Sequence, residues 1–347
     1  MIRLTQYAHG AGCGCKIAPA VLQQMVHPAD ATPVYPNLWV GHETNDDAAV
    51  WDLGNGELLI ATTDFFTPIV DDAYAYGRIA AANALSDVYA MGGQPLLALA
   101  VLGWPVEKLP ADLAQQVLAG ARSICAEAHI PLAGGHSIDA AEPFFGLAVN
   151  GKVAAAYLKR NNTAREGDLL FLTKPIGVGI LTTAEKRDAL LPEHRGLALQ
   201  YMQQLNRIGT VLAQTEGVTA MTDVTGFGLL GHLIEMAAGS GLSAELHYSC
   251  VPVLDAARTY LAQRIVPDAT YRNWNSYGQE VDFAAEVPVL EAFNLLPDPQ
   301  TNGGLLVAVR PAAAAAVSDL LQQQGIPSCE PIGHLVPAGE KRVRVLP

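Results

Sequence analysis

Hydrophobic and polar positions follow two periods along the chain, which predict strands and helices in turn. Apolar runs bounded by turn residues predict strands at 48–51, 58–62, 95–102, 132–133, 146–149 and 152–153. Helical spacing predicts a helix over 77–91, ended by Gly92-Gly93, and a second helix over 113–128. From Leu38 to about residue 160, the chain therefore shows an alternation of strands and helices.

The most polar stretch of the chain, 159–168, predicts a linker between two domains. After it, the pattern predicts strands at 169–173, 244–248, 305–309 and 342–346, and helices ending at 184 and covering 197–213 and 229–237. Residues 1–35 lack sustained periodicity and predict an irregular arm with one short helix near 19–26. The expected division is an arm over 1–35, a first domain over 36–157 and a second over 168–347.

Composition narrows the class of protein. A chain of 347 residues suits two cores better than one. No apolar run approaches the roughly 18–20 residues of a membrane span, and the start of the chain has no signal-peptide pattern. Five cysteines are too few for a disulfide framework, which favours the reducing cytoplasm.

The charge balance narrows the class of protein further. A net charge of −13 argues against non-specific binding to nucleic acid or to a membrane surface. An acidic protein still binds polyanions where metal ions or a few placed lysines neutralise them.

Residues 9–16 read His-Gly-Ala-Gly-Cys-Gly-Cys-Lys and place two thiols in a glycine-rich segment. Lys16 follows Cys15 directly, and a nearby cation stabilises the nucleophilic thiolate. Glycines allow positive φ and close approach to a ligand. The segment predicts a reactive arm, although a Cys-x-Cys pair also suits a soft metal ion.

Aspartates fall at the ends of several predicted elements, and one of them lies on a predicted helix one turn after Asn83, sharing its face. Oxygen ligands without Cys or His partners suit Mg²⁺, which a few carboxylates hold together with substrate phosphates. Each aspartate taken alone is equally well explained as a turn former or helix cap. The candidates are Asp46, Asp47, Asp64, Asp87 and Asp223.

Two glycine motifs have competing explanations. Residues 134–137 (Gly-Gly-His-Ser) follow a predicted strand and suit either an anion cradle or a tight turn. Residues 226–231 match the dinucleotide pattern G-x-G-x-x-G, but the next acid, Glu245, lies 14 residues on rather than about twenty. Packing glycines beside Asp223 explain this second motif better.

Taken together, the motifs resemble the selenophosphate synthetases, also called selenide, water dikinases. The matching stretches are QYAHGAGCGCK (6–16), TNDDAAV (44–50), TTDFF (62–66), NALSDVYAMGG (83–93), AGGHSID (133–139), AMTDVTGFGLLGH (220–232) and DPQTNGGLL (298–306). They occur in the family's order over nearly the whole chain. Cys13 stands where some members carry selenocysteine, and Asn302 where the family more often shows serine.

The resemblance implies a two-domain ATP-binding fold like that of aminoimidazole ribonucleotide synthetase, with an N-terminal α/β domain and a C-terminal α+β domain. It implies a homodimer joined by the N-terminal sheets, and Mg²⁺ as cofactor. The implied reaction converts ATP, hydrogen selenide and water to selenophosphate, AMP and orthophosphate, which supplies selenium for selenocysteine and selenouridine. A selenium-delivery protein is a possible partner.

By position, the resemblance makes Cys13 the active-site thiol and Lys16 the essential lysine. The implied magnesium ligands are Asp47, Asp87 and Asp223. The implied nucleotide contacts are Lys16, Thr44, Asn45, Asp46, Asp64, Asp87, Gly135, His136 and Ser137. Two rivals are a small-metabolite kinase of the same superfamily, which would release ADP, and a thiol carrier without ATP turnover.

Overall fold

The computed structural model describes residues 2–8, 10–17, 21, 25, 34–41 and 45–347. Its first sheet has six strands in the order β1-β2-β3-β6-β4-β5 and is antiparallel except for the β4–β5 pair. The strands are β1 (Leu38–Val40), β2 (Ala49–Asp52), β3 (Glu57–Phe66), β4 (Gln94–Trp104), β5 (Leu132–Asp139) and β6 (Phe144–Ala154).

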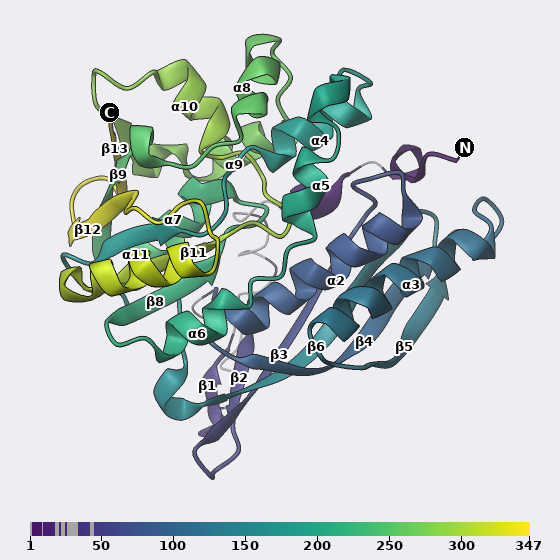
Figure 1. Cartoon of the computed structure of the whole chain (residues 1–347), viewed down its shortest axis with the longest axis horizontal. Helices are drawn as coiled ribbons and strands as arrows, with labels where there is room; N and C mark the ends of the chain where they lie inside the picture. The colour runs from purple at the N-terminus through teal and green to yellow at the C-terminus, as the bar shows by residue number, and fades with distance from the viewer. Residues whose placement is uncertain (1, 9, 18–20, 22–24, 26–33, 42–44) are drawn as a thin grey trace.

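Helices α2 (Ala73–Ala90) and α3 (Ala111–Glu127) cover one face of this sheet (Figure 1). Asp72 caps α2 by accepting a hydrogen bond from the Ala75 amide at 2.6 Å. Nearly every residue of α2 is buried, because the sheet and α3 lie on two sides of it and the second domain lies on a third. A helix so enclosed holds the polar side chains that it carries in defined positions.

The second sheet has seven strands in the order β10-β13-β9-β12-β7-β11-β8. They are β7 (Leu169–Leu172), β8 (Val218–Asp223), β9 (Leu242–His247), β10 (Val281–Phe283), β11 (Leu305–Val309), β12 (Gly333–Pro337) and β13 (Val343–Leu346). The accompanying helices are α4 (Val178–Lys186), α5 (Leu197–Met202), α6 (Ile208–Gln214), α7 (Gly228–Gly239), α8 (Asp255–Ala262), α9 (Asp268–Tyr277), α10 (Val289–Leu295) and α11 (Ala314–Gln323).

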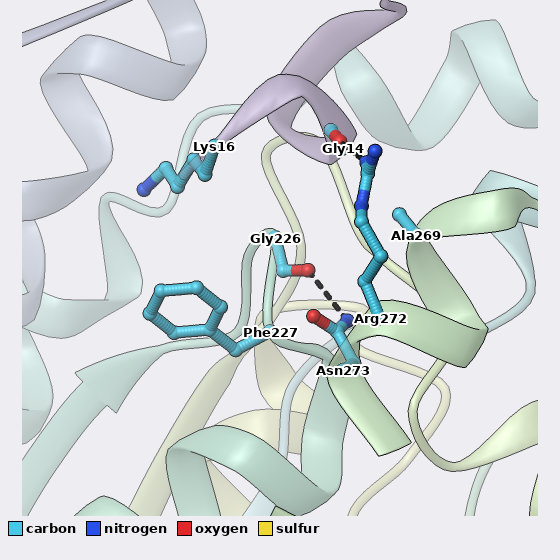
Figure 2. Close-up of a pocket in the computed structure, with 7 residues that line it drawn as sticks. All are labelled: Gly14, Lys16, Gly226, Phe227, Ala269, Arg272 and Asn273. Atoms are coloured by element: carbon cyan, nitrogen blue, oxygen red, sulfur yellow. Dashed lines mark hydrogen bonds between the residues drawn. The ribbon is translucent and has the colours of Figure 1, made fainter. Parts of the chain in front are cut away.

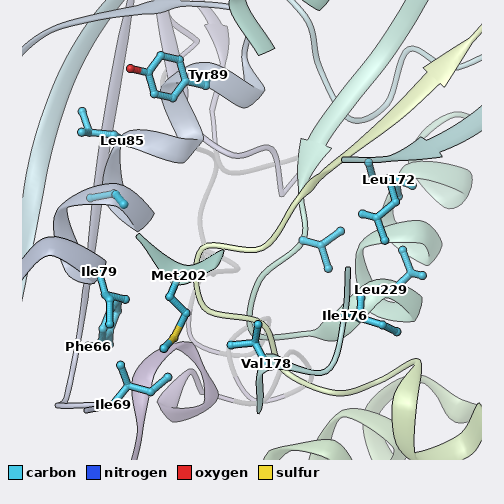
Figure 3. Close-up of a cluster of buried hydrophobic side chains, with 14 of the residues drawn as sticks. Phe66, Ile69, Ile79, Leu85, Tyr89, Leu172, Ile176, Val178, Met202 and Leu229 are labelled. Atoms are coloured by element: carbon cyan, nitrogen blue, oxygen red, sulfur yellow. The ribbon is translucent and has the colours of Figure 1, made fainter. Parts of the chain in front are cut away.

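The hydrophobic core is continuous across the two sheets. Figure 3 shows Leu85 and Tyr89 of α2 on one side and Leu172 and Leu229 of the second domain on the other, with Met202 between them. Helices α5 and α6 fill the space between α2 and the second sheet (Figure 1). This shared core fixes α2 relative to β8, and α2 and β8 both carry candidate site residues.

The prediction of a single helix over 197–213 was wrong. The structure has two helices, α5 and α6, and the residues between them turn toward the neighbouring domain. The Gln204 carbonyl accepts hydrogen bonds from Lys174 Nζ and Asn302 Nδ2, and Asn206 Nδ2 donates to Ser86 Oγ at 2.8 Å. These tertiary bonds replace the helical bonds that the local pattern favoured.

Three strands are longer than predicted. Strand β3 does not end before Asp64 but continues to Phe66, because its pairing with β6 is unbroken from Glu57 to Phe66. The two short strands expected at 146–149 and 152–153 are one strand, β6. Strand β5 also extends, from the predicted 132–133 to Asp139.

The short helix expected near 19–26 lies largely outside the described residues. Within the described ranges, no helix has the length and apolar character needed to cross a membrane.

Candidate active site

The inner face of β3 and the facing side of α2 bring two carboxylates together with two neutral partners. Alternation along β3 points Thr62 and Asp64 toward α2. Asn83 Nδ2 donates to Asp64 Oδ2 at 2.7 Å, and the Thr62 hydroxyl donates to Asp87 Oδ2. Asn83 and Asp87 share a face of α2, as their spacing predicted.

Two further carboxylates approach from other elements. Asp47 lies in the loop before β2, and its Oδ1 accepts a hydrogen bond from the Thr222 hydroxyl at 2.8 Å. Asp223 follows Thr222 at the end of β8 and is only 2% exposed. We call Asp47, Asp64, Asp87 and Asp223 the acidic cluster.

Asp46 lies beside this cluster. It accepts backbone hydrogen bonds from Asn161 at 3.1 Å and from Asp47 at 3.3 Å. Asn161 also holds the Asn45 carbonyl through its Nδ2 at 2.8 Å. Burial raises the pKa of Asp46 to about 6, and these backbone bonds oppose the shift.

The acidic cluster is strongly self-repelling. Burial raises the pKa of Asp47 well above its ordinary value, and the charges of Asp223, Asp46 and Asp87 raise it further. Burial also raises the pKa of Asp87 well above its ordinary value, and the charges of Asp223 and Asp64 raise it further. Carboxylates arranged in this way require a nearby cation or bound protons.

Unpartnered oxygens indicate where a cation fits. Asp47 Oδ2 and Asp223 Oδ2 are buried and, within the described residues, accept no hydrogen bond. Among those same residues, no three or more His, Cys, Asp and Glu side chains are arranged as a cage that could hold a metal ion. Mg²⁺ does not need such a cage, because it takes one or two carboxylates together with water and phosphate oxygens. The donor set therefore fits magnesium held jointly with a substrate.

The glycine-rich arm reaches the acidic cluster through Lys16. Its Nζ lies 3.7 Å from Asp64 Oδ2. Burial raises the pKa of Asp223, as it does that of Asp87, and the charge of Lys16 offsets part of each rise. A short 3₁₀ turn, Gly12–Cys15, precedes it. The structure describes the backbone of this turn but not the side chains of Cys13 and Cys15, and Thr44 also lies outside the described residues.

A small pocket lies between this turn and the second domain, with room for about one water-sized group. Figure 2 shows Arg272 reaching up to Gly14 while Lys16 extends to the other side of the turn. Below them, Asn273 donates to the Gly226 carbonyl at 2.8 Å. The pocket is therefore bordered by the arm above and by α9 and the start of α7 below.

Gly135, His136 and Ser137 do not form the tight turn that was one of the two explanations considered. They lie within β5, an exposed edge strand that pairs in parallel with β4. Gly135 lies level with Asp64 across the sheet, but two strands, β6 and β4, separate their strands. At about 4.8 Å per strand, the two backbones are roughly 14 Å apart, so one chain does not bring these residues to the acidic cluster.

Several polar residues of the site were not foreseen. Thr62 and Thr222 hold Asp87 and Asp47, and a hydrogen bond from Ser86 lowers the pKa of Asp223. Side chains alternate between the two faces of a strand, so Thr62, two residues before Asp64, could have been identified from the sequence as lying on the same face. No sequence signal pairs Thr222 with Asp47, because 175 residues separate them.

The G-x-G-x-x-G motif does not belong to a dinucleotide-binding unit. Strands β8 and β9 flank α7, but β11, β7 and β12 separate them in the sheet. A dinucleotide fold needs parallel neighbouring strands joined by the helix. The glycines instead lie where Asn273 and Tyr277 of α9 bond the carbonyls of Gly226 and Phe227.

Comparisons with known proteins agree with this architecture. Residues 45–153 match the family "AIR synthase related protein, N-terminal domain", and residues 165–346 match its C-terminal domain. Thiamine-monophosphate kinase from Stenotrophomonas maltophilia superposes with a TM-score of 0.65 at 20% identity, covering 89% of this chain and 91% of that one. Hydrogenase maturation protein HypE in complex with ATP superposes with a TM-score of 0.64 at 21% identity, covering 88% and 83%.

The two sheets and their helices thus define an AIR synthase-related protein. Among curated sequences, a selenide, water dikinase from Colwellia psychrerythraea is 57% identical over 345 residues, which is 99% of each chain. One from Yersinia pseudotuberculosis is 56% identical over 99% of this chain and 97% of its own length. The chain belongs to the selenide, water dikinase family.

Proposed function

We propose that this protein makes selenophosphate from ATP, selenide and water, releasing AMP and orthophosphate. One observation carries the proposal: buried, unpartnered carboxylate oxygens and Lys16 of the glycine-rich arm belong to the same site. A net-negative protein binds a polyphosphate only where cations offset both sets of charge. The 53–57% identity to selenide, water dikinases over nearly full length supports the choice of substrate.

In this proposal Asp47, Asp87 and Asp223 hold magnesium. The bound ion would neutralise phosphate charge as the phosphate bonds are cleaved. Thr222 donates a hydrogen bond to one oxygen of Asp47, and Thr62 donates one to an oxygen of Asp87. These bonds orient the two carboxylates. Such preorientation removes reorganisation from the transfer step.

Lys16 contacts the polyphosphate, and Cys13 is the thiol that engages selenium. Asp64 orients Lys16, and Asn83 holds this carboxylate in place by donating to the same oxygen, Oδ2. We assign the remaining nucleotide contacts to Thr44, Asn45, Asp46, Asp64 and Asp87. Closure of the arm over the nucleotide would exclude bulk water from the first transfer.

We also propose a homodimer joined through the first sheet. The face of this sheet opposite α2 and α3 exposes large apolar side chains, among them Trp51, Phe65 and Leu99. Exposed apolar patches of this kind mark interaction surfaces. In a dimer, Gly135, His136 and Ser137 would reach the nucleotide of the partner subunit, which accounts for their distance from the acidic cluster in one chain.

The protein is expected to act in the cytoplasm, where reduced thiols and selenide persist. A delivery protein that presents selenium to the arm is a further expected partner. Neither expectation depends on the geometry of the acidic cluster.

Phosphorus NMR of purified protein with ATP, magnesium and selenide tests the reaction directly. We expect selenophosphate, orthophosphate and AMP. ADP as the only nucleotide product would indicate the simpler kinase, and the absence of turnover would indicate a thiol carrier.

Cys13→Ser should abolish the formation of selenophosphate while ATP binding persists. Cys15→Ser is the matched control and should remain active. Normal product from Cys13→Ser would overturn the role assigned to this thiol.

A further inference from the structure

Two cationic side chains hold backbone carbonyls of the arm, one before Cys13 and one after it, at the turn Gly12–Cys15. Lys186 Nζ, at the end of α4, donates to the Gly10 carbonyl at 3.3 Å. Arg272 Nη2, on α9, donates to the Gly14 carbonyl at 2.5 Å. The two donors come from separate helices of the second domain and bond carbonyls on both sides of Cys13 in the chain.

The first domain holds the same segment differently. The Gly12 amide donates to the Thr67 carbonyl at 3.1 Å, and Lys16 lies beside Asp64. Further back, the amide and hydroxyl of Thr5 both donate to Asp71 Oδ1. The arm therefore bridges the two domains, and its contacts with the second domain include these two carbonyl bonds.

The glycine content of the arm explains why Lys186 and Arg272 bond its backbone carbonyls. Gly10, Gly12 and Gly14 present no side chain, so the backbone is what neighbouring elements can hold there. Ordering glycines also costs more conformational entropy than ordering other residues. Hydrogen bonds from charged donors are stronger than neutral ones and offset this cost.

We propose that Lys186 and Arg272 form a carbonyl clamp, a pair of positioning residues that hold the arm turn over the acidic cluster. The inference rests on the proposed function and deepens it, because it assigns a role to two residues that are not among the proposed nucleotide contacts or metal ligands. The clamp sets the positions of Cys13 and Lys16 together, since both lie within two residues of Gly14.

The location of Arg272 supports this role. Its aliphatic part and its guanidinium border the small pocket, on the other side of Gly14 from Lys16 (Figure 2). Ala269 lies one turn earlier on α9 and close to Gly14. A Cβ added to Gly14 would lie 3.4 Å from the Cβ of Ala269. Helix α9 therefore supports the turn by packing as well as by the hydrogen bond.

The test compares Arg272→Met and Lys186→Met, which keep the aliphatic stem and remove the donor. Arg258→Met, on α8, is the matched control, because Arg258 pairs with Asp255 and Glu291 and not with the described residues of the arm. Arg272→Lys is the rescue variant, since lysine retains a charged donor.

The first readout does not need activity. Brief alkylation, followed by denaturation and trypsin, reports both arm thiols on the peptide 4–16, and exposed Cys250 serves as the internal reference. We expect each Met variant to change the alkylation rate of the arm peptide relative to Cys250 by about fivefold or more, with Arg258→Met unchanged and Arg272→Lys restored toward the wild-type ratio.

The second readout is kinetic. We expect kcat for selenophosphate to fall about tenfold in each Met variant while the KM for ATP changes less than about twofold, because the nucleotide contacts remain. Unchanged alkylation ratios and unchanged kcat in both Met variants would overturn the clamp, as would failure of Arg272→Lys to restore either quantity. If the wild type made no selenophosphate, the proposed function would fail while the alkylation ratios still decided the clamp.

Discussion

Gly12 combines two properties that disfavour a larger residue at its position. Its φ is 53°, and a Cβ there would lie 2.4 Å from Ile69 Cδ1 and 2.5 Å from Thr301 Oγ1. Gly14, two residues on, has only ordinary contacts around the place of a Cβ. The glycines of the arm are therefore not equivalent, although the sequence presents them alike.

Gly12→Ala should lower the rate of selenophosphate formation about tenfold or more, because left-handed backbone strain and the close neighbours both displace the turn. Gly14→Ala should stay within about threefold of wild type. Steady-state kinetics of the pair checks this prediction, and equal losses in both variants would contradict it.

Removing one charge from the acidic cluster should have opposite effects on stability and on function. Asp223→Asn relieves repulsion among buried carboxylates, so metal-free protein should melt about 2–4 °C higher. The same change should weaken magnesium-dependent ATP binding about tenfold or more, since a proposed ligand is lost.

Calorimetric titration and thermal melts measure these two effects. Asp319→Asn, an exposed change on α11, is the control and should alter neither quantity. An Asp223→Asn variant that binds Mg-ATP with unchanged affinity would move the metal site elsewhere.

At the scale of elements, the loop before β11 joins the two domains through polar bonds. Asn302 is buried, and its Nδ2 donates to the carbonyls of Met202 and Gln204. Its backbone amide donates to Asn83 Oδ1 at 2.7 Å, so this loop also supports the residue that holds Asp64. Asn302 is thus a connection between domains.

Asp298 fixes the start of the same loop and makes stability depend on pH. Its Oδ2 accepts hydrogen bonds from the Gly179 amide at 3.0 Å and from Gln300 Nε2 at 2.8 Å. Burial raises the pKa of Asp298 to about 8, against about 4 in an unfolded chain. Between these values the folded state holds a proton that the unfolded state has lost, so this group's contribution to stability falls as pH rises.

Asp298→Asn should remove that dependence. Urea unfolding at pH 5 and at pH 8 should show the wild type losing more stability between the two pH values than the variant does. Asp319→Asn should follow the wild-type profile. Parallel profiles for wild type and Asp298→Asn would contradict the assignment.

At the scale of the whole molecule, the uncovered face of the first sheet predicts association. Phe65 is 49% exposed there and lies with its ring centroid 5.5 Å from that of Phe144. Phe65→Glu should convert a dimer to a monomer, because it places a charge in an apolar interface. Leu290→Glu, at an 81% exposed position on α10, is the control and should remain dimeric.

Sedimentation velocity reports the assembly state of these variants. The monomer should also lose turnover, because Gly135, His136 and Ser137 would no longer reach a partner's nucleotide. A monomeric wild type with full activity would overturn this arrangement.

Elements with a strong local pattern were predicted well, and elements shaped by distant contacts were not. The apolar residues of 77–91 and 113–128 predicted α2 and α3 to within a few residues. The break between α5 and α6 was missed because its cause is bonding to Lys174, Asn302 and Ser86, which lie far away in the sequence. The greater part of strand β5 was missed because pairing with β4, not local hydrophobicity, makes 134–137 a strand.

The sequence by itself determined the chemistry available to this protein: a thiol pair and a lysine in a glycine-rich arm, and aspartates in several separate elements. Residue identity and short spacing decide such properties. Only the tertiary structure decided that Asp47, Asp64, Asp87 and Asp223 share one buried site with Lys16, that 134–137 lie three strands away, and that Lys186 and Arg272 hold the arm. The physical reason is that strand order and domain packing join residues more than 100 positions apart, and no local pattern encodes that separation.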